Sequence, residues 1–370
     1  MISPFIQDRI AAAQFLVAGC GALGNEVLKN LALMGAGHVT IVDFDRVEQG
    51  NLSRSVLYGK ADVGQYKVDV AARKLREMNP ALQVDTICGD VAYDVGLGLV
   101  RQMDVVIGCV DNRWARYCIN RLCMRAGKPW VDGGIDLLEG TVRVFAPGQN
   151  CYACNLGPEG LKDLQRRMPC SGTIRRNEEA GHAPTTSLTA SVIGAVQVQE
   201  ALKLLHPEAE LASLCGRMFY YEGGQLSTRV VAFRAYDPDC PVHDAWTPVH
   251  PTAVQPGMPV NQALSQLQKE LRSARVTLHL AADCFVDYVA RRSDNRRTGV
   301  MLPGRSVAAF VEKDPELGGL PLSALYQHEY RDIDNDFPYQ ALRLRDLGIP
   351  KRDVLWVSTP GGDDYLEMAS

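Results

Sequence analysis

Three glycines in the pattern Gly19-x-Gly21-x-x-Gly24 follow a short apolar run and lead into a segment whose apolar residues recur at helical spacing. Glycine allows backbone N–H groups to approach a ligand closely, and the first turn of a helix favours anions. The next β-branched run ends in Asp43 and Asp45, and an acid about twenty residues after such a turn can bond ribose hydroxyls. These residues predict a nucleotide site with phosphate at the glycine turn.

Several cationic and amide donors follow this pair of acids, namely Arg46, Asn51, Arg54 and Lys67. A dinucleotide needs few such groups, whereas a triphosphate with a scissile α–β bond needs positive charge around the leaving pyrophosphate. The donors therefore favour ATP over the nicotinamide cofactor of a dehydrogenase. The alternative is that they are solvated loop charges.

Two short knuckles carry metal-ligand residue types, Cys151-x-x-Cys154 and, much later, Cys240-x-x-His243. Together they supply the three thiolates and one imidazole of a tetrahedral zinc site. With all four positions filled by protein, no site stays open for water, so the zinc would be structural. One Cys-x-x-Cys alone could instead be a redox pair.

Cys170 follows a Met-Pro pair in a polar segment. Nearby arginines would stabilise its thiolate, which is the nucleophilic form of cysteine. The alternative is an exposed thiol without a chemical role. The odd total of eleven cysteines, in a chain without an export signal, argues against a disulfide framework. The arginines near Cys170 are Arg166, Arg167, Arg175 and Arg176.

Strands and helices are expected to alternate through the first half of the chain, which predicts an α/β fold with a Rossmann-like, doubly wound sheet. Asp111 ends the fourth expected strand, at the edge where ligands bind in such sheets. It could instead cap the helix that follows, and Arg116 could anchor it. Strands are expected at 15–19, 39–45, 82–90 and 103–112, and helices at 25–37, 68–80, 96–102 and 114–127.

Beyond these elements, a helix is expected to begin at Thr186 or Ser187, with Leu188, Val192, Val196 and Leu202 on its apolar face. Residues 1–246 are expected to form the first domain, with the zinc knuckles inside it. A proline-rich linker over 247–260 and a smaller α+β domain over 261–370 are expected to follow.

Four segments, read in order, resemble the ATP-binding core of the ubiquitin-activating, E1-like enzymes and the ThiF/MoeB/HesA-type adenylyltransferases. The resemblance covers roughly residues 12–245 and depends on the combination of motifs. The segments are GCGALG, VDFDRVEQGNLSR, VGQYKVDVAARKLREMNP and CVDN.

The resemblance implies that the chain uses ATP and Mg²⁺ to adenylate the C-terminal carboxylate of a small partner, a ubiquitin-like or sulfur-carrier protein ending in glycine. Position by position, it implies that Asp43 holds the ribose and Asp111 the magnesium. The three glycines and Asp45 belong to the same nucleotide site. The family commonly has a structural zinc at the knuckles. The residues assigned to the phosphates are Asn51, Arg54 and Lys67.

The same resemblance places Cys170 in the loop that bears the catalytic cysteine of ubiquitin-type activating enzymes, although the local spacing is altered. It implies that Cys170 displaces AMP and passes the partner, held as a thioester, to a conjugating enzyme. The ending LRLRDLGIPKRDVLWVSTPGGDDYLEM looks similar to the ubiquitin-fold domain that recruits that enzyme. A homodimer is expected, and only Arg9 is available as the arginine that the family inserts into its partner's site.

Composition excludes some classes of function. A formal net charge of −4 and a pI near 6.0 argue against electrostatic nucleic-acid binding. The absence of an eighteen-residue apolar run or a signal-like start predicts a soluble, cytoplasmic protein without membrane contact. The extra domain favours a bacterial-style ubiquitin-like conjugation pathway. The alternatives are a sulfur-carrier adenylyltransferase that stops at the acyl-adenylate, and a non-catalytic scaffold.

Overall fold

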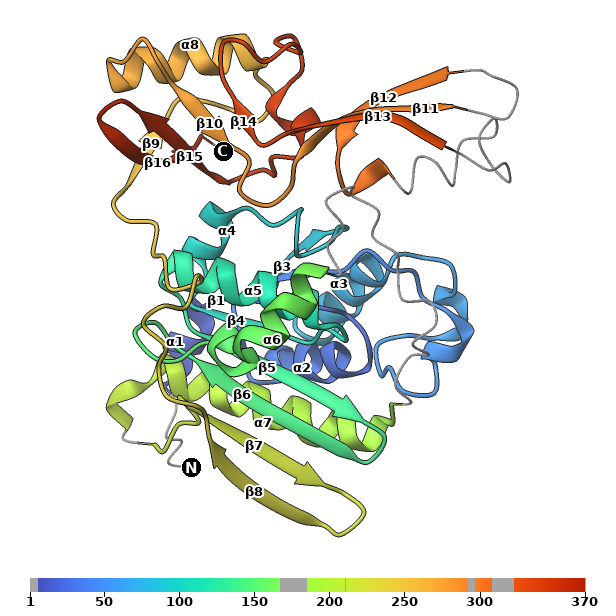
Figure 1. The fold of residues 1–370 in the computed structure, drawn as a ribbon. Coiled ribbons are helices and arrows are strands. Elements are labelled where there is room, and N and C mark those ends of the chain that lie inside the picture. The colour runs from blue at the N-terminus through green and yellow to red at the C-terminus, as the bar shows by residue number, and fades with distance from the viewer. Residues whose placement is uncertain (1–5, 167–184, 210, 292–296, 308–322, 370) are drawn as a thin grey trace. The chain divides into compact units, whose positions relative to one another are not determined.

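The computed structural model describes residues 6–166, 185–209, 211–291, 297–307 and 323–369 (Figure 1). By its internal contacts the chain divides into two compact units. The first unit comprises Met1–Ala92, Leu99–Gly157 and Ala180–Ala245. The second comprises Tyr93–Gly98, Pro158–Glu179 and Trp246–Ser370.

The first unit is built on an eight-stranded sheet in the order β3-β2-β1-β4-β5-β6-β7-β8. Its first five strands are parallel, in the order typical of nucleotide-binding doubly wound folds, and the last three extend the sheet antiparallel. The predicted α/β fold class is thereby confirmed. The strands are β1 (Gln14–Ala18), β2 (His38–Val42), β3 (Gln83–Ile87), β4 (Val105–Gly108), β5 (Trp130–Asp136), β6 (Glu139–Phe145), β7 (Arg217–Glu222) and β8 (Ser227–Ala232).

Helices cover both faces of this sheet. On β5, a Cβ at Gly133 would meet Gln197 of α7, whereas the next glycine, Gly134, faces Arg116 of α5. Since successive strand residues point to opposite faces, α5 and α7 lie on opposite sides. The helices up to α7 are α1 (Gln7–Ala12), α2 (Ala22–Leu33), α3 (Lys67–Met78), α4 (Leu97–Gln102), α5 (Arg113–Ala126), α6 (Tyr152–Arg166) and α7 (Ser187–Leu205). Helix α6 is interrupted at Gly157, and its residues from Pro158 on, like the first two residues of α4, belong to the second unit.

The apolar face predicted for α7 is partly wrong. Leu188 is 72% exposed and Val192 is 36% exposed, whereas Ile193 and Val198 are buried. The helix packs against α2 as well as against β5 and β6, so its buried surface is set by two neighbours rather than by a single stripe. Thr186 is the N-cap, because its hydroxyl accepts a hydrogen bond from the backbone N–H of Thr189.

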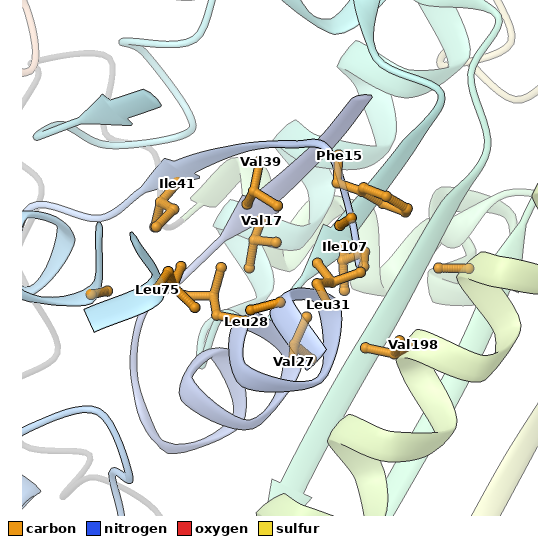
Figure 2. Close-up of a cluster of buried hydrophobic side chains, with 14 of the residues drawn as sticks. Phe15, Val17, Val27, Leu28, Leu31, Val39, Ile41, Leu75, Ile107 and Val198 are labelled. Carbon is orange, nitrogen blue, oxygen red and sulfur yellow. The ribbon is translucent and has the colours of Figure 1, made fainter. Parts of the chain in front are cut away.

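Alternate side chains of the central strands interlock with α2, α3 and α7 to form the core of the first unit (Figure 2). Burying each large apolar side chain contributes about 1.5–3 kcal/mol. This packing fixes the carboxyl ends of β1, β2 and β4 at one edge of the sheet. The core residues labelled in Figure 2 are Phe15, Val17, Val27, Leu28, Leu31, Val39, Ile41, Leu75, Ile107 and Val198.

The second unit contains a five-stranded sheet, β14-β10-β15-β16-β9, and a three-stranded sheet, β12-β11-β13. Helix α8 (Val260–Leu271) contributes Val260, Leu264 and Leu267 to its core. Strand β9 (Val249–Thr252) pairs with β16, so residues 249–252 of the expected linker are part of a sheet. The remaining strands are β10 (Thr277–His279), β11 (Phe285–Arg291), β12 (Arg297–Pro303), β13 (Ser323–Tyr330), β14 (Asp332–Ile333), β15 (Val354–Thr359) and β16 (Gly362–Met368).

No helix in the described ranges is both long enough and apolar enough to cross a lipid bilayer.

Candidate functional site

The glycine turn joins β1 to α2 and requires glycine for different reasons at its three positions. Gly19 has φ +97°, and a Cβ there would lie 2.5 Å from the carbonyl oxygen of Cys109. A Cβ on Gly24 would lie 2.0 Å from the carbonyl oxygen of Gly19, so only glycine lets the helix approach the turn. A Cβ on Gly21 would meet no atom within 4 Å, which leaves open space at the start of α2.

Two buried side chains, those of Tyr58 and Asn25, hold the glycine turn in place by hydrogen bonds. The carbonyl oxygen of Cys20 accepts hydrogen bonds from the Tyr58 hydroxyl at 2.6 Å and from the Asn25 amide at 2.9 Å. Gly21 is the N-cap of α2, and no side chain caps that helix. The first backbone N–H groups of α2 are therefore suited to an anion. Sequence reasoning missed both supports, although an asparagine in the first turn of an apolar helix was a usable signal.

Asp43 fastens the end of β2 to this turn. Its carboxylate accepts the backbone N–H of Cys20 at 2.6 Å and that of Asp45 at 2.8 Å. Burial raises the pKa of Asp43 above its ordinary value, although Lys67 and the two backbone donors oppose the change. A carboxylate oxygen has two lone pairs, so the group can orient the turn and still accept a ribose hydroxyl.

Lys67, the first residue of α3, lies beside both acids. Its ammonium is 2.9 Å from the Asp45 carboxylate. Burial alone would lower the pKa of Lys67, but attraction to Asp43 and the hydrogen bond to Asp45 outweigh burial and raise it. The structure thus brings together three residues that the sequence predicted for one site.

This arrangement predicts a pH-dependent contribution of Lys67 to stability. A raised pKa means that the folded protein binds the Lys67 proton more tightly than the unfolded chain does. The contribution of Lys67 to the free energy of unfolding is therefore complete below the unfolded pKa of 10.5 and is lost as the pH rises through the higher folded pKa. In chemical unfolding, the difference in free energy between wild type and Lys67→Met should therefore shrink at strongly alkaline pH. Lys74→Met, which removes a half-exposed surface pair with Glu77, should show a small difference at every pH. A constant Lys67→Met difference would contradict the prediction.

Asn51 and Arg54 make local bonds in the described structure. The Asn51 side chain accepts the backbone N–H of Glu48 at 2.9 Å and closes a short 3₁₀ turn, η1 (Gln49–Asn51). The Arg54 guanidinium donates to the carbonyl oxygen of Gly50 at 2.8 Å. The bond at Asn51 leaves its amide nitrogen as a donor, and a guanidinium carries five N–H groups. Phosphate contacts from both residues remain a prediction.

Asp111 is exposed in the turn between β4 and α5. The N-cap of α5 is Asn112, whose side chain accepts the backbone N–H of Ala115 at 2.7 Å and donates to Asp111 at 3.4 Å. The interpretation of Asp111 as the helix cap is therefore wrong. Because β4 is parallel to β1, the turn that bears Asp111 and the glycine turn both lie at the carboxyl-end edge of the sheet.

Arg116 forms its close ion pair with Asp132 rather than with Asp111. Its Nε lies 3.0 Å from Asp132, and its Nη2 donates to the carbonyl oxygen of Gly133 at 3.0 Å. Asp132 is fully buried, and the Arg143 guanidinium lies 2.5 Å from its other carboxylate oxygen. Sequence reasoning missed this cluster, and its only signal was an acid within an apolar strand.

The four predicted zinc ligands lie together. One ligand atom from each of Cys151, Cys154, Cys240 and His243 falls within 4.8 Å of the others. The Cys151 sulfur is 3.7 Å from that of Cys154 and 3.8 Å from that of Cys240. Sulfurs bound tetrahedrally to zinc at about 2.3 Å lie about 3.8 Å apart. The residues therefore fit zinc, and Tyr236 stacks on the His243 ring at 4.5 Å between centroids.

The structure does not place the two other predicted residues, Cys170 and Arg9, in the nucleotide site. Cys170 lies outside the described residues. Arg9 donates to the carbonyl oxygen of Leu205 at 2.7 Å and pairs with Glu208 at 2.6 Å, so it is held at the end of α7 in its own chain.

A model of the ThiF family matches residues 2–242. The chain belongs to the ThiF family. The resemblance found in the sequence is thereby confirmed. Among similar members, the SAMP-activating enzyme E1 of Haloferax volcanii is 33% identical over 241 residues, which is 65% of this chain and 84% of that protein. The sulfur carrier protein adenylyltransferase of Thermus thermophilus is 33% identical over 247 residues, 65% of this chain and 86% of that protein.

Other similar proteins are longer or more distant. The adenylyltransferase and sulfurtransferase MOCS3 of Bos taurus is 34% identical over 236 residues, which is 63% of this ThiF-family chain but only 49% of that protein. A solved structure of E. coli MccB with ATP has a TM-score of 0.51 and 22% identity, and the match covers 64% of this chain and 68% of that one. At this identity the likeness supports the fold alone.

Proposed function

We propose that this ThiF-family chain adenylates the C-terminal carboxylate of a small ubiquitin-like or sulfur-carrier protein. A carboxylate oxygen attacks the α-phosphorus of ATP, the bond from that phosphorus to the oxygen bridging to the β-phosphate breaks, and pyrophosphate leaves. The first turn of α2 receives phosphate, and Asp43 receives the ribose. Asp111 would hold magnesium, which would supply charge neutralisation for the leaving pyrophosphate. Asn51, Arg54 and Lys67 surround the phosphates.

One observation carries this proposal. The open space at Gly21 and the linked group of Asp43, Asp45 and Lys67 lie at the carboxyl edge of parallel strands, where a doubly wound sheet binds nucleotides. Two carboxylates against one ammonium leave a local negative charge, which suits a site that also receives a divalent cation. The names of the similar proteins support a carrier protein as substrate, since they include activation of SAMP and adenylylation of a sulfur carrier.

In the second step proposed here, the Cys170 thiolate attacks the carbonyl carbon of the acyl-adenylate, AMP leaves, and the carrier is held as a thioester. Transfer to a conjugating enzyme would follow, with the second unit as its docking domain. We also propose that the working form is a homodimer in the cytoplasm, and that zinc bound by the knuckles is structural. The second candidate is an enzyme that stops at the acyl-adenylate and serves sulfur transfer, which the Thermus thermophilus relative favours.

The test combines the protein, ATP, magnesium and a ubiquitin-like sulfur-carrier protein ending in Gly-Gly. Exchange between pyrophosphate and ATP should require the carrier, and Asp111→Asn should slow it by about 100-fold because charge stabilisation in the transition state is lost. A reductant-sensitive band on a gel should mark the thioester and disappear in Cys170→Ala.

Two control variants make the test specific. Asp8→Asn removes an exposed carboxylate in α1 and should leave exchange unchanged, and Cys88→Ala removes an exposed thiol and should keep the band. Exchange with no band in wild type would support the enzyme that stops at the acyl-adenylate. No exchange with any carrier would refute adenylation.

A further inference from the structure

A buried ion cluster ties together β5, β6 and α5 in the first unit. Asp132 on β5 and Arg143 on β6 are directly opposed in the antiparallel ladder, and Arg116 reaches Asp132 from the second turn of α5. The Asp132 side chain is fully buried, whereas 13% of Arg116 and 22% of Arg143 remain exposed. Two guanidinium groups against one carboxylate leave a net positive charge, and Arg116 lies about one helical turn from the start of α5, which follows the turn that bears Asp111.

The cluster adjoins a partly exposed face of the strand pair β5–β6, where the Tyr152 ring lies beside the Arg143 guanidinium. Along β6, Gly140 and Val142 are buried toward α7, whereas Thr141 and Arg143 on the opposite face are partly exposed. On β5 the neighbouring position is Gly134, where even a Cβ would approach the Thr141 hydroxyl to 3.0 Å. The side chains of Thr141 and Arg116 occupy the space beside Gly134, and we call this face of the strand pair, from the β5–β6 turn to Arg143, the path.

Charge changes sign along this path. Its far end, at the β5–β6 turn, carries the exposed acids Asp136 and Glu139, and its near end carries the arginine pair. Among the described residues, the Arg143 Nε and the Asp132 Oδ2 are both buried without a hydrogen-bond partner, although the Arg143 Nη2 lies 2.5 Å from that oxygen. A buried donor of this kind carries a desolvation cost unless a partner arrives.

We infer that Arg143, oriented by Asp132, is the docking cation for the C-terminal carboxylate of the carrier protein. The inference rests on the proposed adenylation and names a specificity-determining residue for it. An extended tail lying along the path meets repulsion at the acids and attraction at Arg143, which directs its ionised end toward the turn that bears Asp111. Arg116, bonded to the backbone of β5, fixes the distance between that turn and the path. Asp132 is a positioning residue, since it is buried away from any ligand.

The experiment measures binding of the carrier protein without nucleotide, by calorimetry, in two forms: the free C-terminal carboxylate and the C-terminal amide. Wild type should prefer the carboxylate by about 10- to 100-fold, as expected for charge-assisted hydrogen bonds. Arg143→Gln should bind both forms alike. Arg229→Gln serves as the matched control, because Arg229 lies on β8 over the Tyr220 ring and should keep the wild-type preference.

Asp132→Asn supplies a second readout. If it folds, it should raise the KM for the carrier in pyrophosphate exchange while the Kd for ATP stays within about twofold of wild type, which a general loss of structure would not do. Equal affinity of wild type for the two carrier forms, or no binding of either, would overturn the inference. An undiminished preference in Arg143→Gln would overturn it as well. Because binding is measured without ATP, the result is separate from a failure of adenylation, which only the exchange assay reports.

Discussion

Gly24→Ala is expected to slow pyrophosphate exchange by roughly 100-fold and to destabilise the fold. The added Cβ would lie 2.0 Å from the Gly19 carbonyl oxygen, so either α2 or the turn must move. Overpacking of this kind costs about 1–3 kcal/mol in unfolding free energy. A displacement of about 1 Å in a binding turn can lower the rate of the reaction by roughly 100-fold. Thermal unfolding and pyrophosphate exchange measure the two effects.

Gly21→Ala is the matched control for this variant. Its Cβ would meet no protein atom within 4 Å, and the backbone φ of −75° suits alanine, so the fold should keep its Tm. The methyl group would nevertheless occupy the space that we assign to phosphate, so ATP affinity should fall without loss of stability. If Gly24→Ala kept wild-type stability and exchange, the close packing of turn and helix would not matter. If Gly21→Ala bound ATP normally, the phosphate would lie elsewhere.

Loss of zinc is the second large effect expected. Wild-type protein should contain about one zinc per chain, and Cys240→Ser should contain almost none, because it removes one of four ligands. Structural zinc contributes about 10–16 kcal/mol of apparent binding free energy in small peptides, so a fall in Tm of several degrees is a conservative expectation here. Metal analysis and thermal unfolding, with and without a chelator, provide the measurements.

Cys88→Ser controls for the loss of a thiol, since Cys88 is exposed and lies outside the knuckles. It should retain both zinc and the wild-type Tm. Zinc-free wild-type protein that unfolds at the same temperature as the metal-bound form would show that the cluster of Cys151, Cys154, Cys240 and His243 has no structural metal.

The parts of this molecule that could be predicted from sequence are those encoded locally. The glycine turn, the strand before it and the acid after the next strand lie within one continuous stretch, so their spacing alone indicates a shared edge. The zinc ligands are far apart in sequence, but each half-site has a recognisable spacing. Each half-site supplies only two of the four ligands that zinc needs, so the presence of both predicts that they lie together, as they do in the structure.

The remaining features depend on contacts between distant segments. The partner of Arg116 is set by which strand lies beside β4, and the sequence near Arg116 offers Asp111 as an equally good choice. The end of β4 contains two possible caps, and only backbone geometry selects Asn112. The buried surface of α7 is decided by α2 and the sheet together. The pairing of β9 with β16 joins segments more than a hundred residues apart, so a proline-rich stretch could not reveal it.

The placement of the four metal ligands has a consequence for the continuity of the chain. Cys151 and Cys154 precede the segment that contains Cys170, whereas Cys240 and His243 follow it. With zinc bound, the metal therefore cross-links the residues before that segment to those after it, in addition to the pairing of β6 with β7. A single peptide cleavage beside Cys170 would then leave two fragments that remain associated. The first unit could thus stay folded even after the chain is cut beside the Cys170 thiol.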